Sequence, residues 1–146
     1  MDKDLYFVAV KVFLRDGDKL LITHDIFGAW DLPGGRIKPD EFNKPLTEVI
    51  NRKMQEELGS EVKFSLASPN GVFFRVERKE HGLGGKKVRI FAVGYDSKYL
   101  SGKIQLGDHH DQMKWVDISS FDPGIYFTGG WLSGIKEYLD KVLGKR

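Results

Sequence analysis

Two neighbouring glutamates near the end of a predicted helix are the residues of this chain best suited to chemistry. The helix is predicted over 44–58 by apolar residues that recur every four positions, Leu46, Ile50, Met54 and Leu58. At about 100° per residue, Lys53, Glu56 and Glu57 project from one side of it. Two carboxylates that share one space repel each other unless a cation lies between them. With a nearby backbone carbonyl, such oxygen ligands suit Mg²⁺ or Mn²⁺.

A divalent ion held by carboxylates typically bridges phosphate oxygens and activates water. Taken alone, however, a Glu-Glu pair near a helix end is more often part of a solvated face. A glycine-rich turn at 34–35 precedes this helix. The wider sequence context is therefore needed to decide between a metal site and a solvated surface.

The residues around the pair resemble the Nudix box. That motif is a glycine, five residues, a glutamate, seven residues, then Arg-Glu, an aliphatic, any residue, Glu-Glu, any residue, Gly and an aliphatic. Gly35 and Glu41 match the first part in spacing, and the segment from Arg52 to Gly59 matches as R-x-U-x-E-E-x-G. The preceding W-x-L-P-G-G at 30–35 is also typical of the family. This context favours the metal site over the solvated face.

The chain departs from the box at three places. Ten residues separate Glu41 from Arg52, which indicates three extra residues around 38–45. Lys53 stands where the family has its first helix glutamate, usually a metal ligand. Because a cation replaces an anionic ligand there, we expect weakened metal binding. Ser60 takes the last aliphatic place, which is a small change.

The resemblance implies a set of roles for the box residues. Glu56 and Glu57 would hold Mg²⁺ or Mn²⁺ together with a backbone carbonyl from Gly34 or Gly35. Either Glu56 or an aspartate of the 108–111 loop would orient or deprotonate the attacking water.

Further roles follow for residues around the metal ligands. Arg52 and Glu41 would brace the loop against the helix, and Lys53 would contact a phosphate and supply part of the charge neutralisation. In the family a late acidic loop often adds another carboxylate to metal or water. His109 takes the place where a glutamate is frequent, and Asp108 and Asp111 flank it. Without the family, the same segment is interpreted as exposed loop, since adjacent residues of an extended chain point to opposite sides.

Three aromatic residues are candidates for stacking on a nucleotide base. These are Phe27 and Trp30, which lie just before the glycine turn, and Phe74. The alternative is that they pack in the core, as most aromatics of such a chain do.

The elements that position these residues are predicted from hydrophobic patterning. Hairpins are expected from 5–14 with 20–23 and from 71–79 with 86–95, and short strands near 30–32 and 112–117. Asn43 is expected to cap the first helix and Gly59 to follow its end. A last helix presents Trp131, Ile135, Leu139 and Val142 on one stripe.

This element order predicts an α/β fold of α+β type, with helices on the faces of a mixed, partly antiparallel sheet. The Nudix resemblance implies an α/β/α sandwich. The length of 146 residues suits a single domain over 1–146.

Composition excludes several classes of protein. With no cysteine, disulfide scaffolds, cysteine nucleophiles and thiolate metal sites are ruled out. The net charge of +2 gives no electrostatic argument for nucleic acid or a membrane surface, and the apolar opening is interrupted by Lys11, unlike a signal peptide or membrane span. We therefore expect a soluble, cytoplasmic protein. Dimers are common in the family, so a homodimer is compatible with the sequence.

The resemblance implies a hydrolase acting on a small nucleotide-type substrate. Its substrate would be a nucleoside diphosphate linked to another moiety, cut at a phosphorus–oxygen bond by water that a divalent metal activates. The alternative is a nucleotide-binding module that keeps the fold after losing a metal ligand. Lys53 and the altered spacing motivate that alternative.

Overall fold

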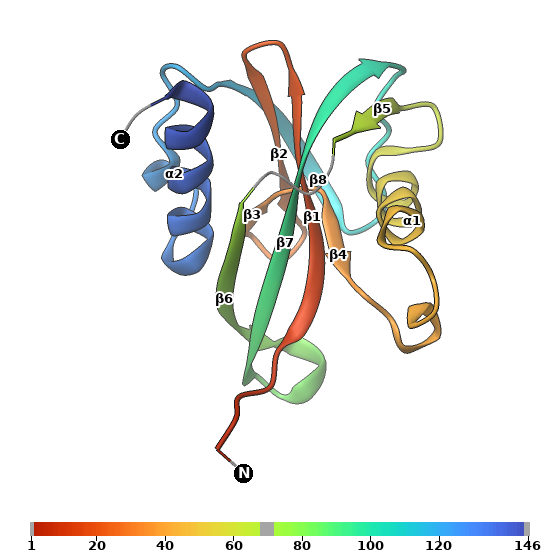
Figure 1. Cartoon of the computed structure of the whole chain (residues 1–146), viewed down its shortest axis with the longest axis vertical. Coiled ribbons are helices and arrows are strands. Elements are labelled where there is room, and N and C mark those ends of the chain that lie inside the picture. Colours follow the sequence, from red (N-terminus) through yellow and green to blue (C-terminus); the bar gives the residue numbers. More distant parts are fainter. Residues whose placement is uncertain (1, 68–71, 145–146) are drawn as a thin grey trace.

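Helices on both sides of one mixed sheet make up the computed structural model, which describes residues 2–67 and 72–144 (Figure 1). The strands are β1 (Phe7–Asp16), β2 (Lys19–Asp25), β3 (Trp30–Asp31), β4 (Gly34–Arg36), β5 (Lys63–Leu66), β6 (Phe73–Glu80), β7 (Lys86–Ser101) and β8 (His110–Asp117). The α-helices are α1 (Leu46–Leu58) and α2 (Gly129–Leu143), with single 3-10 turns η1 (Pro39–Glu41), η2 (His81–Leu83) and η3 (Pro123–Ile125).

Strand β1 is the centre of the sheet. It runs parallel to β7, with Phe7 opposite Ile90, and antiparallel to both β2 and β4. The main strand order is β3-β2-β1-β7-β5, while β6 pairs with β7 and β8 pairs with β2. The predicted hairpins β1–β2 and β6–β7 are both present. The mixed α+β fold predicted from the sequence is confirmed.

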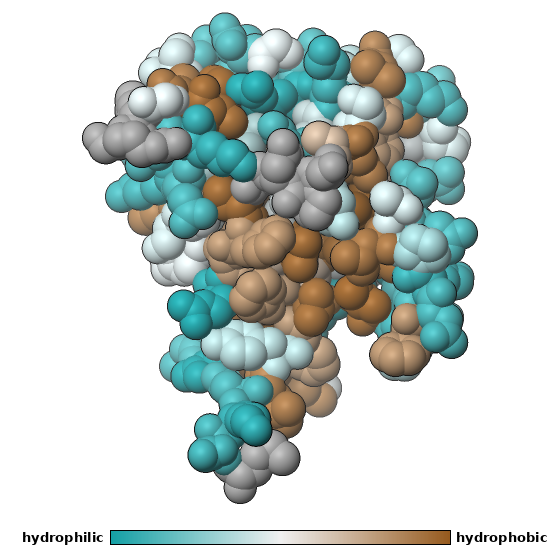
Figure 2. Space-filling view, in the orientation of Figure 1, coloured by the Kyte–Doolittle hydropathy of each residue, from teal (hydrophilic) through white to brown (hydrophobic). Residues whose placement is uncertain are grey.

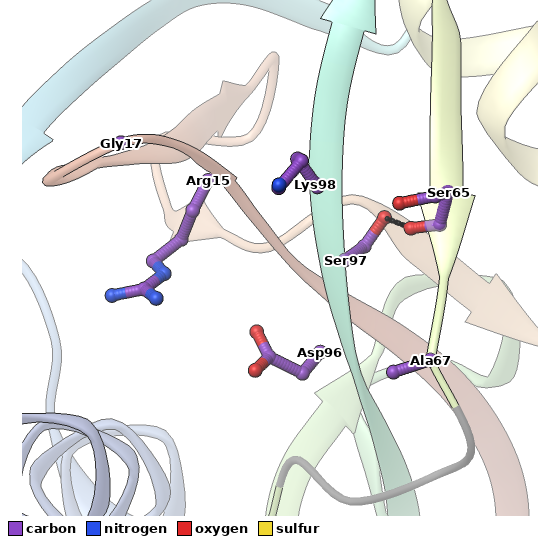
Figure 3. A pocket seen from close by; sticks show the side chains of 7 residues that line it. All are labelled: Arg15, Gly17, Ser65, Ala67, Asp96, Ser97 and Lys98. Atoms are coloured by element: carbon purple, nitrogen blue, oxygen red, sulfur yellow. Dashed lines mark hydrogen bonds between the residues drawn. The ribbon is translucent and has the colours of Figure 1, made fainter.

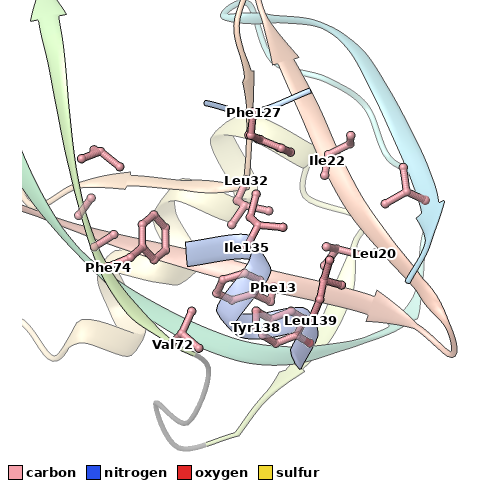
Figure 4. Packing of buried hydrophobic residues seen from close by; sticks show 14 of the residues in the cluster. Phe13, Leu20, Ile22, Leu32, Val72, Phe74, Phe127, Ile135, Tyr138 and Leu139 are labelled. Carbon is pink, nitrogen blue, oxygen red and sulfur yellow. The ribbon is translucent and has the colours of Figure 1, made fainter. Parts of the chain in front are cut away.

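The alternation of side chains along β1 divides the core into two layers. Val10 and Val12 point to one face and pack with α1, whereas Ala9 and Phe13 point to the other and pack with α2. On the α2 face, Tyr138 stacks on Phe13 with ring centroids 4.0 Å apart (Figure 4). The sheet is thus covered on both faces, and the site described below lies where β4 joins β1.

The ends of α1 follow the sequence prediction only in part. Gly59 follows the last turn with a φ of +93°, as predicted. The prediction of Asn43 as the cap is wrong, because the helix begins at Leu46 with Pro45 in the cap position. Lys44 still donates its backbone N–H to Glu41 in the preceding turn, so Asn43 lies outside the first helical turn.

Two short strands, β4 and β5, were not predicted. The glycine pair at 34–35, predicted as a turn, lies in β4, because its backbone pairs with β1 in spite of the poor strand propensity of glycine. β7 and β8 are both longer than predicted, and Gly71, the first residue of the predicted 71–79 strand, lies outside the described residues.

Apolar side chains gather over the strands between the two helices, with hydrophilic residues around them (Figure 2). Phe73 on β6 and Val8 on β1 are exposed at 51% and 38%. Among the residues that the structure describes, no helix combines the length and the apolar character needed to cross a membrane.

Replacing Phe13 with Ala tests the α2 layer of the core. Phe13 is fully buried, and its ring contacts Tyr138 and Phe74. We expect Phe13→Ala to lower the free energy of unfolding by about 3–5 kcal/mol in urea titrations, because it leaves a cavity. The matched control is Phe42→Ala, which removes a ring that is 88% exposed and should change stability by less than about 0.5 kcal/mol. Similar effects of the two variants would contradict this assignment of the core.

Candidate active site

Glu57 joins α1 to the glycine turn. Its Oε1 accepts a hydrogen bond from the Gly34 N–H at 3.1 Å, and the side chain is 10% exposed. Gly34 has a φ of +127°, and a Cβ there would lie 2.1 Å from the carbonyl oxygen of Val10. Only glycine can therefore pass β1 this closely and still donate to Glu57. Burial raises the pKa of Glu57, with the charge of Lys11 acting in the opposite direction.

Arg52 links α1 to the loop that precedes it. Its Nε donates to Glu41 Oε2 at 2.6 Å and its Nη2 donates to Oε1 at 2.7 Å. Glu41 is buried and also accepts from the Lys38 N–H. The hydrogen bonds from Arg52 lower the pKa of Glu41 to about 2. The longer spacing between Glu41 and Arg52 is taken up by the turn at 42–45, so the two side chains still meet.

Lys53 lies between the two carboxylates of the helix. Its Nζ is 3.4 Å from Glu56 Oε2 and 3.6 Å from Glu57 Oε2. Its aliphatic chain packs on Gly35, where a Cβ would lie 2.3 Å from Lys53 Cε. Both glutamates predicted to bind metal are thus directed at one cationic group beside the glycine turn.

Glu56 and Glu57 fit a hard divalent cation as donors, since their oxygens already converge on the ammonium of Lys53. Within residues 2–67 and 72–144, no group of three or more His, Asp or Glu side chains is arranged to hold a metal ion. Mg²⁺ usually keeps several waters and takes one or two carboxylates plus substrate phosphates. The pair therefore fits an ion whose remaining ligands come from the backbone, water and substrate.

A cavity of about 150 Å³ borders the glycine turn on the α2 face of the sheet. Gly34 and Gly35 form part of its wall, and its polar and aromatic lining consists of Lys11, Asp31, Arg36, Arg78 and Trp131. No residue of α1 lines this cavity. Strand β4 is therefore a wall shared by the cavity and the carboxylate cluster.

The charged groups of the cavity differ in how far they are neutralised. Lys11 is buried, with its Nζ 3.0 Å from Asp31 Oδ1 and 5.1 Å from the centroid of the Trp131 ring. Arg36 pairs with Glu80, whereas Arg78 has no hydrogen bond or ion pair within the described part of the chain. With three cations and one carboxylate in its lining, the cavity favours an anionic group.

The 108–111 loop lies against the end of α1. The Gly107 N–H donates to the backbone oxygen of Glu57, which brings the loop to the helix. Asp108 and His109 are exposed, while Asp111 Oδ1 lies 2.7 Å from Nδ1 of His24. The segment is thus tied to the end of α1 through Gly107, and Asp111, which the structure places in β8 and not in a loop, already has a partner.

The predicted stacking residues lie apart from the carboxylates. Trp30 packs edge-to-face with Tyr126 and His24, at centroid distances of 5.3 Å and 5.1 Å. Phe27 is 63% exposed in the turn before β3. The structure therefore places Trp30 partly in the core layer of α2, and Phe27 on the surface.

Four residues near the site were not selected from the sequence: Lys11, Asp31, His110 and Trp131. The sequence did contain a signal for Lys11, which is a lysine within the apolar segment 5–14. A lysine is rarely buried in a strand unless its charge has a partner. His110 Nδ1 is buried and has no hydrogen-bond partner among residues 2–67 and 72–144, and a charge on this ring would act on Glu57. The choice between His109 and His110 depends on where β8 begins, which the sequence does not fix.

A second pocket, of about 320 Å³, lies at the end of β1 farther from β4 (Figure 3). It contains Arg15, Lys98 and Asp96, and the Asp96 carboxylate accepts a hydrogen bond from the Tyr138 hydroxyl at 2.8 Å. None of the residues predicted to do chemistry lines it. The cluster around Glu57 is therefore the candidate active site.

The NUDIX domain family model matches residues 5–130, so the chain belongs to the Nudix family. Members of this family generally use divalent metals and act on small nucleotide-type substrates. No curated protein matches the chain in sequence.

Solved structures share the fold at low sequence identity. The MutT protein from Methanosarcina mazei Go1 has 21% identity and a TM-score of 0.72, with 99% of each chain covered. A C. elegans Ap4A hydrolase binary complex has 14% identity and a TM-score of 0.67, covering 94% of this chain and 98% of that one. A UDP-X diphosphatase has 17% identity and a TM-score of 0.64, covering 100% of this chain and 67% of that one.

The ion pair between Glu41 and Arg52 should make the free energy of unfolding depend on pH. The pKa of Glu41 is about 2 in the folded chain against 4.5 as its ordinary value. The stabilisation is therefore complete above about pH 4.5 and is lost as the pH falls toward 2. We expect Glu41→Gln to be less stable than the wild type at pH 7, and the difference to shrink toward pH 2, in urea titrations at stepped pH.

The control is Glu48→Gln, which changes an exposed glutamate in the first turn of the same helix. A constant difference between wild type and Glu41→Gln across this pH range would count against the ion pair.

Proposed function

We propose that this chain is a pyrophosphohydrolase that cleaves a nucleoside diphosphate linked to another moiety. One observation carries the proposal: Glu56 and Glu57 converge on one cation position beside the glycine turn. The adjoining cavity has an excess of cationic side chains and an indole ring, which suit a phosphate and a base or sugar. Structural neighbours that include an Ap4A hydrolase and a UDP-X diphosphatase support this substrate class.

The carboxylates Glu56 and Glu57, with a backbone carbonyl of Gly34 or Gly35, are proposed to hold Mg²⁺ or Mn²⁺. When bound, such an ion polarises phosphate oxygens and increases the acidity of water. Lys53 is close enough to this position to donate to a phosphate oxygen. Arg52 and Glu41 hold the loop against α1 and so act as positioning residues.

The reaction requires a proton acceptor for the attacking water. The water oxygen forms a bond to phosphorus while the bridging phosphorus–oxygen bond breaks. The proton passes to a carboxylate, either Glu56 or an aspartate of the 108–111 loop, and the leaving phosphate oxygen is protonated by solvent. Asp111 is engaged by His24, and Glu56 is engaged by Arg52 and Lys53, so either acceptor has to release a partner before it takes the proton.

A second candidate function is nucleotide binding without catalysis. The specific observation in its favour is Lys53, whose ammonium occupies the position between the two carboxylates. The two functions differ in one result. A binding module holds nucleotides but gives no metal-dependent turnover, whereas the enzyme gives both.

The proposed hydrolysis is tested by replacing Glu57. We expect wild type to release phosphate-containing products from nucleoside diphosphate derivatives with Mg²⁺ or Mn²⁺, and not with a chelator. Glu57→Gln should lower kcat by about 10²-fold or more, because it removes a charge that the site needs. The control is Glu48→Gln, on the exposed side of the same helix. Tight nucleotide binding without turnover across the substrate panel would instead support the binding module.

The proposed role of the cavity is tested at Arg78. Arg78→Ala should raise KM by about tenfold with little change in kcat, because a charge-assisted hydrogen bond to the substrate is lost. Arg75→Ala is the matched control, since Arg75 lies on the same strand, is exposed and does not line the cavity. Equal KM values for the two variants would show that the cavity does not bind the substrate.

A further inference from the structure

The position of Lys53 suggests more than a weakened metal site. Its ammonium lies within 3.6 Å of one oxygen of both Glu56 and Glu57, and its side chain is only 21% exposed. The aliphatic part of the Lys53 side chain also packs against Gly35, where it fills the space that a Cβ would occupy. Lys53 is therefore a packed component of the carboxylate cluster.

Other groups also engage both carboxylates. Glu57 Oε1 accepts from the Gly34 N–H, and Glu56 accepts from Arg52 Nη1 at 3.1 Å on Oε1 and at 3.3 Å on Oε2. The Oε2 of each glutamate also faces Lys53. The ammonium thus lies at the position on which both carboxylates converge, and it shares Glu56 Oε2 with Arg52.

A divalent ion and the ammonium cannot both occupy this position, because like charges at such short range repel each other. Binding of the ion therefore requires the Lys53 ammonium to move away. Lysine has a flexible four-carbon side chain that can carry its charge to a new partner. A surface suited to anions borders the same strand: the cavity whose wall includes Gly34 and Gly35.

We propose that Lys53 is an internal cation that competes with the divalent ion and couples ion binding to phosphate binding. In the free protein the ammonium neutralises Glu56 and Glu57 and keeps affinity for the ion low. A substrate phosphate that accepts a hydrogen bond from Lys53 draws the ammonium away and opens the position to the ion. This inference rests on the proposed function for the identity of the anion, a nucleoside diphosphate.

Coupling of this kind is reciprocal: the factor by which nucleotide tightens ion binding equals the factor by which the ion tightens nucleotide binding. Couplings between two ligands of one protein commonly amount to about 5- to 150-fold. The charge of Lys53 is the origin of the effect. Removing that charge should therefore tighten ion binding in the free protein and reduce the coupling.

The test is Mn²⁺ binding, followed by electron paramagnetic resonance, to wild type and Lys53→Met. Methionine keeps most of the chain that packs on Gly35 and removes the charge. Without nucleotide, we expect Lys53→Met to bind Mn²⁺ at least tenfold more tightly than wild type. Lys44→Met, which changes an exposed lysine before α1, should bind as wild type does. Lys53→Gln provides a second neutral variant should the methionine variant fold poorly.

The coupling is tested by repeating the titrations with α,β-methylene-ADP, a nucleotide that is not cleaved at that linkage. Its own complex with Mn²⁺ affects all variants equally and is measured without protein. We expect nucleotide to tighten Mn²⁺ binding more in wild type than in Lys53→Met. Equal Mn²⁺ affinities of the two free proteins, or equal effects of nucleotide on both, would overturn the inference.

Failure of this inference can be distinguished from failure of the proposed function. Equal Mn²⁺ affinities together with turnover that Glu57→Gln abolishes would overturn the competition and leave the hydrolase. Tighter Mn²⁺ binding by Lys53→Met without any turnover by wild type would support the competition and overturn the hydrolase.

Discussion

The hydrogen bond from the Gly34 N–H to the buried carboxylate of Glu57 is the contact on which the site depends. It fixes the end of α1 against the turn that leads into β4. A carboxylate in an apolar setting is costly unless it accepts hydrogen bonds or faces a cation, and Glu57 has both. The same residue therefore joins two elements and presents an oxygen at the cation position.

The other features of the site can be understood as responses to that buried charge. Lys53 neutralises it from one side, and Lys11 lies close enough to lower its pKa from the other. Two of the three residues of β4 are glycines without side chains. The carboxylate cluster and the cavity therefore approach each other across this single strand.

The sequence predicted the helix and the shared side of its charged residues, because both depend on local spacing. The glycine turn predicted at 34–35 is instead strand β4, which forms only by pairing with β1. Glu56, Glu57 and Lys53 meet since they lie three and four positions apart on one helix. Lys11 and Trp131 belong to elements far apart in the chain, and no local pattern brings them together. The predicted cap of α1 was wrong for a related reason. The turn after η1 follows the tertiary ion pair of Glu41 with Arg52, and not the preference of Asn43 for helix N-caps.

The family resemblance selected Glu56 and Glu57 as candidate ligands, yet it could not give their geometry. That both glutamates direct an oxygen at Lys53 depends on side-chain packing against Gly35. The inward direction of His110 likewise depends on the register of β8 against β2, which a hydrophobic pattern leaves open.

The parallel pairing of β1 with β7 has a consequence for how the molecule reaches its folded state. Phe7 pairs with Ile90, so closing the centre of the sheet joins parts of the chain separated by α1 and five intervening strands. Contacts between distant segments carry a large loop-closure entropy, and they slow folding. The hairpins and helices can form early from local contacts, whereas the Lys11 cavity needs β1, β6, β7 and α2 in place. The part of the protein around this cavity is therefore expected to be the last to assemble.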